Sequence, residues 1–143
     1  MGKNLEGSWP RPDTADVVVV GGSAAGFYTA TQLARGGKRV RVLESKPRLE
    51  PASRTLIVTN HFREQLGSVA TESIVNEIRR FELFTDGRSA QVALGKPDLI
   101  IERSRLIPAL AREATAAGAS ISFDTRFLGL SSNGSGLQLE VES

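Results

Sequence analysis

The sequence of 143 residues predicts an α/β fold in which helices pack on a parallel β-sheet. Three observations predict this fold. A β-branched run at 16–20 ends at two glycines, as expected for a strand buried on both faces of a parallel sheet. A helical spacing of apolar and small residues over 23–35 also ends at two glycines. An alternating segment at 38–44 then completes a β-α-β unit, whose crossover is right-handed almost without exception.

The remainder of the chain is expected to add shorter elements and two β-hairpins. Residues 45–59 contain two prolines and no clear period, which predicts an ordered connection without a helix or strand. Turn residues at 86–88 and 131–136 predict the hairpins. The predicted elements are short helices at 60–66 and 71–79, a hairpin of strands 80–85 and 89–94, a strand at 98–102, a helix with Pro108 in its first turn and Gly118 just past its end, a strand at 119–123, and a second hairpin of strands 126–130 and 137–141.

The chain divides into a short leader and one domain. Residues 1–15 predict a flexible leader, and residues 16–143 predict a single domain without internal repeats. The first thirteen residues lack the apolar core of a secretory signal. No apolar run approaches the roughly 20 residues that span a bilayer. We therefore expect a cytoplasmic protein without a membrane span.

The composition excludes several kinds of chemistry. The absence of Cys, with His61 as the one His, excludes disulfides, thiolate nucleophiles and Cys-ligated metal centres and predicts no metal site. The 18 basic and 16 acidic residues leave a net charge of +2, which gives no indication of a nucleic-acid partner. His61 is expected to be a surface or structural residue, and the sequence contains no G-x-S-x-G elbow, so no catalytic residue is nominated.

The segment that carries chemistry is Gly-Gly-Ser-Ala-Ala-Gly at 21–26, between the first strand and the first helix. In a dinucleotide-binding fold, the first glycine of such a turn permits a tight bend, the second allows a pyrophosphate to approach, and the third allows helix and strand to pack closely. Gly21 and Gly26 occupy the first and third positions. Ser23 occupies the second, where its Cβ adds bulk but its hydroxyl can donate to a phosphate oxygen. The amides at the start of the helix would face the pyrophosphate.

An acidic residue, Glu44, ends the second strand 18 positions after Gly26. An acid at this place accepts hydrogen bonds from adenosine ribose hydroxyls, and its charge repels a 2′-phosphate. The pattern therefore favours FAD or NAD over NADP and predicts a Rossmann-like FAD/NAD(P)-binding domain. The alternative is a glycine-rich turn that only packs a helix on a sheet.

A resemblance to a known family extends over residues 16–142. It is clearest in VVVVGGSAAGFYTATQLARGGKRVRVLESKP at 17–47, which resembles the N-terminal FAD-binding segment of the flavoprotein oxidoreductases typified by para-hydroxybenzoate hydroxylase and geranylgeranyl reductase. IERSRL at 101–106 looks like the R-x-x-L helix start of that group. GASISFDTRF at 118–127 is similar to its strand pair, beside which the adenine lies.

The resemblance implies which further side chains approach FAD. In the family the arginine of R-x-x-L contacts the flavin nucleotide, which falls on Arg103, and the arginine after the second strand falls on Arg54. For each arginine the alternative is a solvated or salt-bridged side chain. The predicted cofactor-binding residues are Gly21, Gly22, Ser23, Ala24, Ala25, Gly26, Glu44, Ser45, Arg54, Arg103 and Phe127.

The resemblance also implies a longer protein. Members of this group return to the flavin in their second half through a Gly-Asp segment, and this sequence has no Gly-Asp dipeptide. We therefore expect the N-terminal part of an FAD-dependent oxidoreductase, monooxygenase-like or reductase-like, whose complete form uses a small organic substrate and a nicotinamide reductant. Two alternatives remain: a non-catalytic or split subunit that needs a complementing chain, and an NAD-binding domain.

Overall fold

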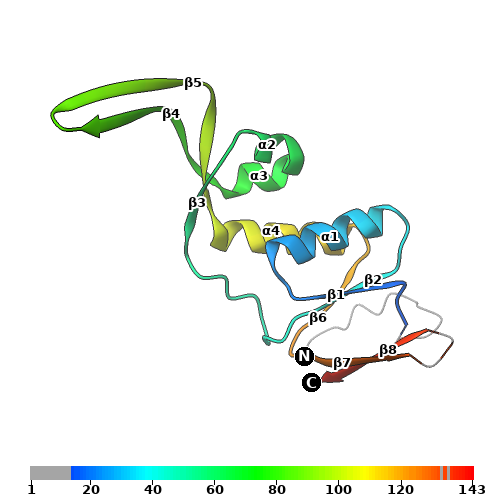
Figure 1. Cartoon of the computed structure of the whole chain (residues 1–143). Coiled ribbons are helices and arrows are strands. Elements are labelled where there is room, and N and C mark those ends of the chain that lie inside the picture. The colour runs from blue at the N-terminus through cyan, green and yellow to red at the C-terminus, as the bar shows by residue number, and fades with distance from the viewer. Residues whose placement is uncertain (1–13, 133, 135) are drawn as a thin grey trace.

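The computed structural model describes residues 14–132, 134 and 136–143 (Figure 1). A parallel sheet, two antiparallel sheets and helices α1 to α4 make up this part of the chain. The predicted leader at 1–15 lies outside the described residues except for its last two, and the turn at 131–136 is described only in part. None of the described helices is long and apolar enough to cross a membrane.

The predicted β-α-β unit is confirmed. β1 (Val17–Val20) and β2 (Val40–Leu43) pair in parallel, with Val17 opposite Val40, and α1 (Ala24–Arg35) connects them. β6 (Ser120–Ser122) pairs in parallel with the other edge of β2. The sheet order is therefore β1-β2-β6, and the predicted α/β fold class is confirmed.

β1 is less buried than its sequence predicts. Val20 has 56% of its surface exposed, whereas Val40 and Val42 of the central strand are fully buried. The expectation that β1 is buried on both faces is therefore wrong in this structure. The reason is its position, because β1 lies at the edge of the sheet and pairs on one side only within the described part of the chain.

Helices α1 and α4 (Arg103–Ala116) lie side by side over one face of the parallel sheet (Figure 1). The inward stripe of α1 buries Phe27 and Ala30, and α4 contributes Leu110 and Ala114 to the same core. These residues recur at three- and four-residue spacings, so each helix presents one apolar face to the sheet. Gly118, with φ of 101°, follows the end of α4 as predicted.

Pro108 lies in the second turn of α4, so its predicted place in the first turn is wrong. The helix begins earlier, at Arg103, because Glu102 is its N-cap and accepts a hydrogen bond from the Ser104 amide. Pro108 has no N–H, so it removes one donor from the interior of the helical hydrogen-bond ladder.

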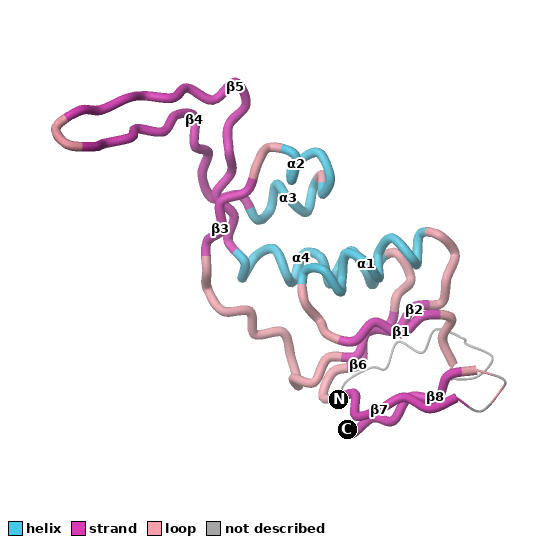
Figure 2. The backbone as a smooth tube through the Cα atoms, viewed as in Figure 1, coloured by secondary structure: helices cyan, strands magenta, loops and turns pink. Residues whose placement is uncertain are grey.

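A second, antiparallel sheet has the order β3-β5-β4. β3 (Thr55–Val58) pairs with the end of β5 (Arg88–Glu102), and β4 (Ile74–Thr85) pairs along most of β5. The outer parts of β4 and β5 form a long ribbon that projects from the body (Figure 2). The hairpin predicted at 80–94 is confirmed, and the strand predicted at 98–102 is the continuation of β5.

Two predictions in this region are wrong. The segment 45–59, predicted to hold no element, contains β3, which is rich in β-branched residues and pairs with 99–102 of β5. The helix predicted at 71–79 is instead the end of α3 (Ser68–Ser73) followed by the start of β4. Tertiary pairing overrides the local helical spacing there, because Ile74 lies opposite Ile101 in the sheet. The helix predicted at 60–66 is confirmed as α2 (His61–Leu66).

The second predicted hairpin is confirmed as β7 (Arg126–Ser132) and β8 (Leu137–Glu142). It follows β6 after a turn in which Asp124 has a φ of 52°. Aspartate tolerates this left-handed conformation better than most residues. After this turn the hairpin lies below the parallel sheet in Figure 1, on the side away from α1 and α4.

Candidate functional site

The carboxyl ends of the three parallel strands meet at one edge of the sheet. β1, β2 and β6 lead there into the segments 21–26, 44–46 and 123–125. α1 and α4 also begin on this side, because each runs back along the sheet and a short turn joins its end to the next parallel strand (Figure 1). We call these three segments and the two helix starts the carboxyl edge. In open α/β sheets, ligands bind outside this edge.

The glycine turn, residues 21–26, reverses the chain between β1 and α1. Gly21 has a φ of 105°, which favours glycine, and its amide donates to the Leu43 carbonyl at 2.8 Å. A Cβ on Gly26 would lie 2.1 Å from the Gly21 carbonyl oxygen. The backbone geometry therefore requires glycine at both positions, and the turn packs α1 directly on β1.

Ser23 is the N-cap of α1 and is exposed. Its Oγ accepts a hydrogen bond from the Gly26 amide at 3.2 Å, which leaves its hydroxyl proton to be donated. The amides of Ala24 and Ala25 lie in the first helical turn, before any N–H has an intrahelical acceptor. This end of α1 therefore presents hydrogen-bond donors together with the positive end of the helix dipole.

Glu44 reaches from the end of β2 to the glycine turn. Its Oε2 accepts a hydrogen bond from the Gly22 amide at 2.8 Å. Its Oε1 accepts from the Lys46 amide at 2.9 Å and from the Ser45 hydroxyl at 3.4 Å. A Cβ on Gly22 would lie 2.8 Å from Oε2, so Gly22 makes room for the carboxylate. A carboxylate offers about four lone-pair sites, so Glu44 can accept a further hydrogen bond.

The turn at 123–125 borders Glu44. The Thr125 amide donates to the Glu44 carbonyl at 2.9 Å, and the Asp124 amide donates to the Lys46 carbonyl at 3.0 Å. Phe127 follows in β7, where it is half-buried and lies opposite Val141. The segment 118–127, which carries the family resemblance, therefore lies beside Glu44. Phe127 follows two residues after Thr125, which makes the contact.

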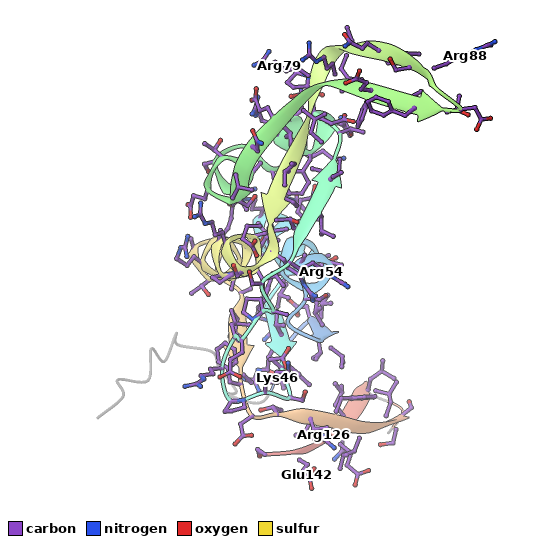
Figure 3. All side chains as sticks on the ribbon, turned by 90° about the vertical axis from the view of Figure 1, so that its left-hand side faces the viewer. Lys46, Arg54, Arg79, Arg88, Arg126 and Glu142 are labelled. Atoms are coloured by element: carbon purple, nitrogen blue, oxygen red, sulfur yellow. The ribbon has the colours of Figure 1, made fainter. Side chains whose placement is uncertain are left out.

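The two predicted arginines are neighbours through their backbones. The Arg103 amide donates to the Arg54 carbonyl at 2.9 Å, where β3 and β5 end their pairing. The Arg54 side chain is exposed, and Figure 3 shows it on the same side of the molecule as Lys46 and Arg126. This is the side on which the carboxyl edge lies, so the structure brings both arginines to that side.

Glu102 is not among the predicted residues, although it lies between the backbones of the two arginines. Its Oε1 accepts hydrogen bonds from the amides of Ser104 at 3.2 Å and Arg54 at 2.9 Å. These two amide donors hold the pKa of Glu102 below its usual value, so the side chain is ionised near neutral pH. Its position directly before a helix could have indicated an N-cap in the sequence, but glutamate is not a preferred N-cap residue.

The site residues fall into two groups. Glu44 and the glycine turn are joined by a hydrogen bond, and Arg54 and Arg103 are joined by another. In the part of the chain that the structure describes, no hydrogen bond connects the two groups. A bound molecule that touches both groups would therefore have to span the distance between them.

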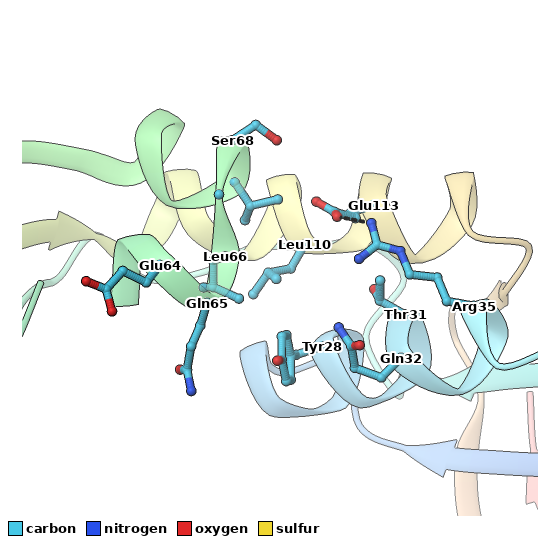
Figure 4. A pocket seen from close by; sticks show the side chains of 12 residues that line it. Tyr28, Thr31, Gln32, Arg35, Glu64, Gln65, Leu66, Ser68, Leu110 and Glu113 are labelled. Atoms are coloured by element: carbon cyan, nitrogen blue, oxygen red, sulfur yellow. Dashed lines mark hydrogen bonds and ion pairs between the residues drawn. The ribbon is translucent and has the colours of Figure 1, made fainter. Parts of the chain in front are cut away.

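A separate cavity of about 260 Å³ lies between α1, α4 and the α2–α3 connection (Figure 4). Tyr28 and Gln32 line it, the Arg35–Glu113 ion pair lies at its α4 side, and none of the predicted site residues takes part. Residues 14–132, 134 and 136–143 contain no group of three or more His, Cys, Asp or Glu that could hold a metal. His61 is exposed and lies 3.2 Å from Glu64. The carboxyl edge therefore remains the candidate site.

The fold is similar to those of several solved proteins. A geranylgeranyl bacteriochlorophyll reductase-like protein from Thermoplasma acidophilum gives a TM-score of 0.72 at 22% identity, over 89% of this chain and 34% of that one. Aklavinone-11 hydroxylase, solved with FAD and aklavinone, gives 0.68 at 24%, over 92% and 30%. CabE, an aromatic hydroxylase from angucycline biosynthesis, gives 0.70 at 27%, over 90% and 27%. This chain thus spans about a third of their length or less.

A comparison with curated protein sequences finds no match. A comparison with protein families does, because residues 14–143 match the family described as FAD binding domain. The match confirms both the predicted resemblance and FAD as the predicted cofactor, and the structural similarities confirm the Rossmann-like fold. Since the match covers nearly the whole sequence, this chain belongs to the FAD binding domain family.

Proposed function

We propose that this chain forms the FAD-binding portion of a flavin-dependent oxidoreductase of the monooxygenase type. The observation that carries the proposal is the glycine turn held against Glu44 by the 2.8 Å hydrogen bond from the Gly22 amide. Backbone donors and an acidic acceptor lie side by side there, as a pyrophosphate and its adjoining ribose require. A Cβ at Gly22 would displace the Glu44 carboxylate, and a Cβ at Gly26 would push α1 away from the turn. The glycines present therefore keep the donors and the acid in the arrangement that fits a dinucleotide.

The first turn of α1 binds the pyrophosphate in this proposal. The amides of Ala24 and Ala25 and the hydroxyl of Ser23 donate to phosphate oxygens, and the helix dipole favours the negative charge. Glu44 accepts hydrogen bonds from the ribose hydroxyls. The charge of Glu44 repels a 2′-phosphate, which disfavours NADP at this site.

The remaining predicted residues contact other parts of the cofactor. Arg54 and Arg103 carry guanidinium groups that approach the flavin nucleotide and offset its phosphate charge. Ser45 and Phe127 border the adenosine, on either side of the contact between Glu44 and Thr125. Support for these roles comes from their common location on the side of the carboxyl edge.

The reaction follows from the cofactor and from the class of similar proteins. Bound FAD supplies the redox chemistry, while the protein binds and orients it. A small organic substrate and a nicotinamide reductant complete the proposed reaction in the full enzyme. The similarity to CabE, an aromatic hydroxylase, at 27% identity supports this class. A cytoplasmic location remains a prediction.

A second candidate is an FAD-binding half that needs a complementing chain. Exposed apolar side chains favour it, since Val20 is 56%, Leu83 59% and Phe84 75% exposed. Val20 lies on the edge strand β1, and Leu83 and Phe84 lie in the ribbon, so a complementing chain would have to cover both places. In this candidate, FAD binds tightly only after the complementing polypeptide covers these residues.

Calorimetric titration of the purified chain with FAD, NAD and NADP tests the proposal. We expect FAD to bind at least about tenfold more tightly than NAD, with visible flavin absorption that stays with the protein. Glu44→Gln should weaken FAD binding, whereas Glu50→Gln, which changes an exposed acid paired with Arg48, should leave it unchanged. Binding of NAD without FAD would overturn the flavin assignment. FAD binding that requires an added polypeptide would favour the second candidate.

A further inference from the structure

The last ladder position between β3 and β5 is only half formed. The pairing of Thr55 with Glu102, continued by one residue, places Arg54 opposite Arg103. Antiparallel partners at a hydrogen-bonded position exchange two hydrogen bonds. The Arg103 amide does donate to the Arg54 carbonyl, at 2.9 Å. The return bond is missing because Arg103 is the first residue of α4, so its carbonyl points along the helix.

The Glu102 side chain supplies the missing acceptor. Its Oε1 lies 2.9 Å from the Arg54 amide nitrogen, where the Arg103 carbonyl would otherwise be. The same oxygen caps α4 through the Ser104 amide at 3.2 Å. The hydroxyls of Ser104 at 3.0 Å and Ser53 at 3.4 Å also donate to it. One carboxylate oxygen therefore ties the start of β3 to the start of α4.

This tie matters because the chain before Arg54 has few other anchors. Residues 47–53 make no backbone–backbone hydrogen bond within the described part of the chain. The Arg54 amide is thus the first backbone donor that is fixed after the Lys46 carbonyl accepts from Asp124 at 3.0 Å. Further back, Leu49 packs against the hydrophobic core. Without the bond to Glu102, the backbone of Arg54 would be held only on its carbonyl side, by the Arg103 amide.

We infer that Glu102 is a positioning residue, whose carboxylate holds Arg54 beside Arg103 at the point where β5 becomes α4. The inference rests on the proposed FAD site, because Arg54 and Arg103 are its predicted cofactor contacts. Glu102 itself acts through the backbone of Arg54 and does not touch the cofactor. The competing explanation is that Glu102 only caps α4.

Two substitutions separate the capping of α4 by Glu102 from its hydrogen bond to the Arg54 amide. Glu102→Ser keeps a preferred N-cap residue for α4, but its side chain is too short to reach the Arg54 amide as well. Glu102→Gln keeps an amide oxygen of the same reach that can accept both hydrogen bonds. Glu113→Gln is the matched control, because it removes an acid from the other end of α4, where it pairs with Arg35.

Amide hydrogen exchange in the absence of FAD measures the tie directly. We expect Glu102→Ser to speed exchange of the Arg54 amide by about tenfold, the loss of roughly one hydrogen bond, while the amides of α4 stay protected. Glu102→Gln should change that rate by less than about threefold, and Glu113→Gln should leave it unchanged. Unchanged Arg54 exchange in Glu102→Ser would overturn the inference whatever happens to FAD binding.

FAD affinity tests whether the hydrogen bond between the Arg54 amide and Glu102 supports cofactor binding. We expect Glu102→Ser to weaken FAD binding by about tenfold, and Glu102→Gln to restore most of it. In an Arg54→Ala background the same Glu102→Ser change should cost less than about twofold, because the side chain that it positions is gone. Normal FAD affinity in Glu102→Ser would overturn the positioning role. An unmodified chain that binds no FAD would instead overturn the proposed function, and the exchange experiment would then decide alone whether Glu102 holds Arg54.

Discussion

The Gly22 amide donates to Oε2 of Glu44 at 2.8 Å, so the turn after β1 and the acid after β2 form one hydrogen-bonded unit. The two strands that carry them are in register up to this point, with Val20 opposite Leu43. The pairing within the strands is between backbones, and this further bond joins the Gly22 backbone to the Glu44 side chain. A change at either residue is therefore expected to disturb both the donor turn and the acidic acceptor of the proposed cofactor site.

Gly22→Ala is expected to weaken FAD binding more than it weakens the fold. Its new Cβ would lie 2.8 Å from Oε2 of Glu44, so the carboxylate must move away from the Gly22 amide. We expect a loss of about tenfold in FAD affinity, equivalent to roughly one hydrogen bond, measured by calorimetry.

Gly95→Ala is the matched control for this change. A Cβ on Gly95 would meet nothing within 4 Å, and Gly95 lies in β5 away from the carboxyl edge. It should leave FAD affinity unchanged. Equal affinities for Gly22→Ala and Gly95→Ala would show that Glu44 can rearrange without consequence for the cofactor.

Gly26→Ala is expected to damage the fold itself. Its Cβ would lie 2.1 Å from the Gly21 carbonyl oxygen, which belongs to the main chain and cannot swing aside as a side chain can. α1 must therefore move away from β1, at a cost of about 1–3 kcal/mol in the free energy of unfolding, as for other overpacked positions. Urea denaturation of the chain without FAD measures this loss, and a midpoint equal to that of Gly95→Ala would contradict it.

Ser23 is expected to matter to α1 as well as to the phosphates. Its Oγ accepts from the Gly26 amide at 3.2 Å, so Ser23→Ala leaves that donor without its cap and should lower the free energy of unfolding by about 1 kcal/mol. Ser23→Gly should cost only a few tenths of a kcal/mol, because glycine is tolerated at the N-cap. Thermal denaturation of both variants checks the order, and equal losses would mean that the hydroxyl does not cap α1.

The main features of the carboxyl edge could be predicted from the sequence because they depend on local backbone requirements. A glycine turn between strand and helix and an acid after the next strand are specified by residues close to each other in the chain. The contact of Gly22 with Glu44 could not be predicted in this way, because it depends on where β2 carries a side chain relative to a turn 22 residues earlier.

Tertiary pairing explains the elements that could not be predicted. β3 lies after a proline-containing stretch without a pattern, and it forms a strand because Leu56 and Ile57 meet Ile101 and Ile100 of β5. Likewise, β1 has the sequence of a central strand but lies at an edge, where Val20 is 56% exposed. Glu102 could not be predicted as a site residue, because its role combines a helix cap with a hydrogen bond to the Arg54 amide, 48 residues away in the sequence.

The ion pair of Asp16 and Arg39 is expected to make stability depend on pH in the acid range. The Arg39 side chain, at 2.6 Å, and the Arg39 amide, at 2.8 Å, lower the pKa of Asp16 from 3.8 to about 2. The folded state therefore binds the proton less readily than the unfolded chain. The stabilisation that the ionised Asp16 gives to the folded state is fully present above about pH 5 and is lost as the pH falls toward 2. Asp16→Asn should lower the urea midpoint at pH 6. The difference in midpoint between this variant and the unmodified chain should shrink between pH 5 and pH 2. Glu82→Gln, which changes an acid in the β4 part of the ribbon, is the control and should show no such narrowing. A difference that stays constant over this range would show that Asp16 does not stabilise the fold through its charge.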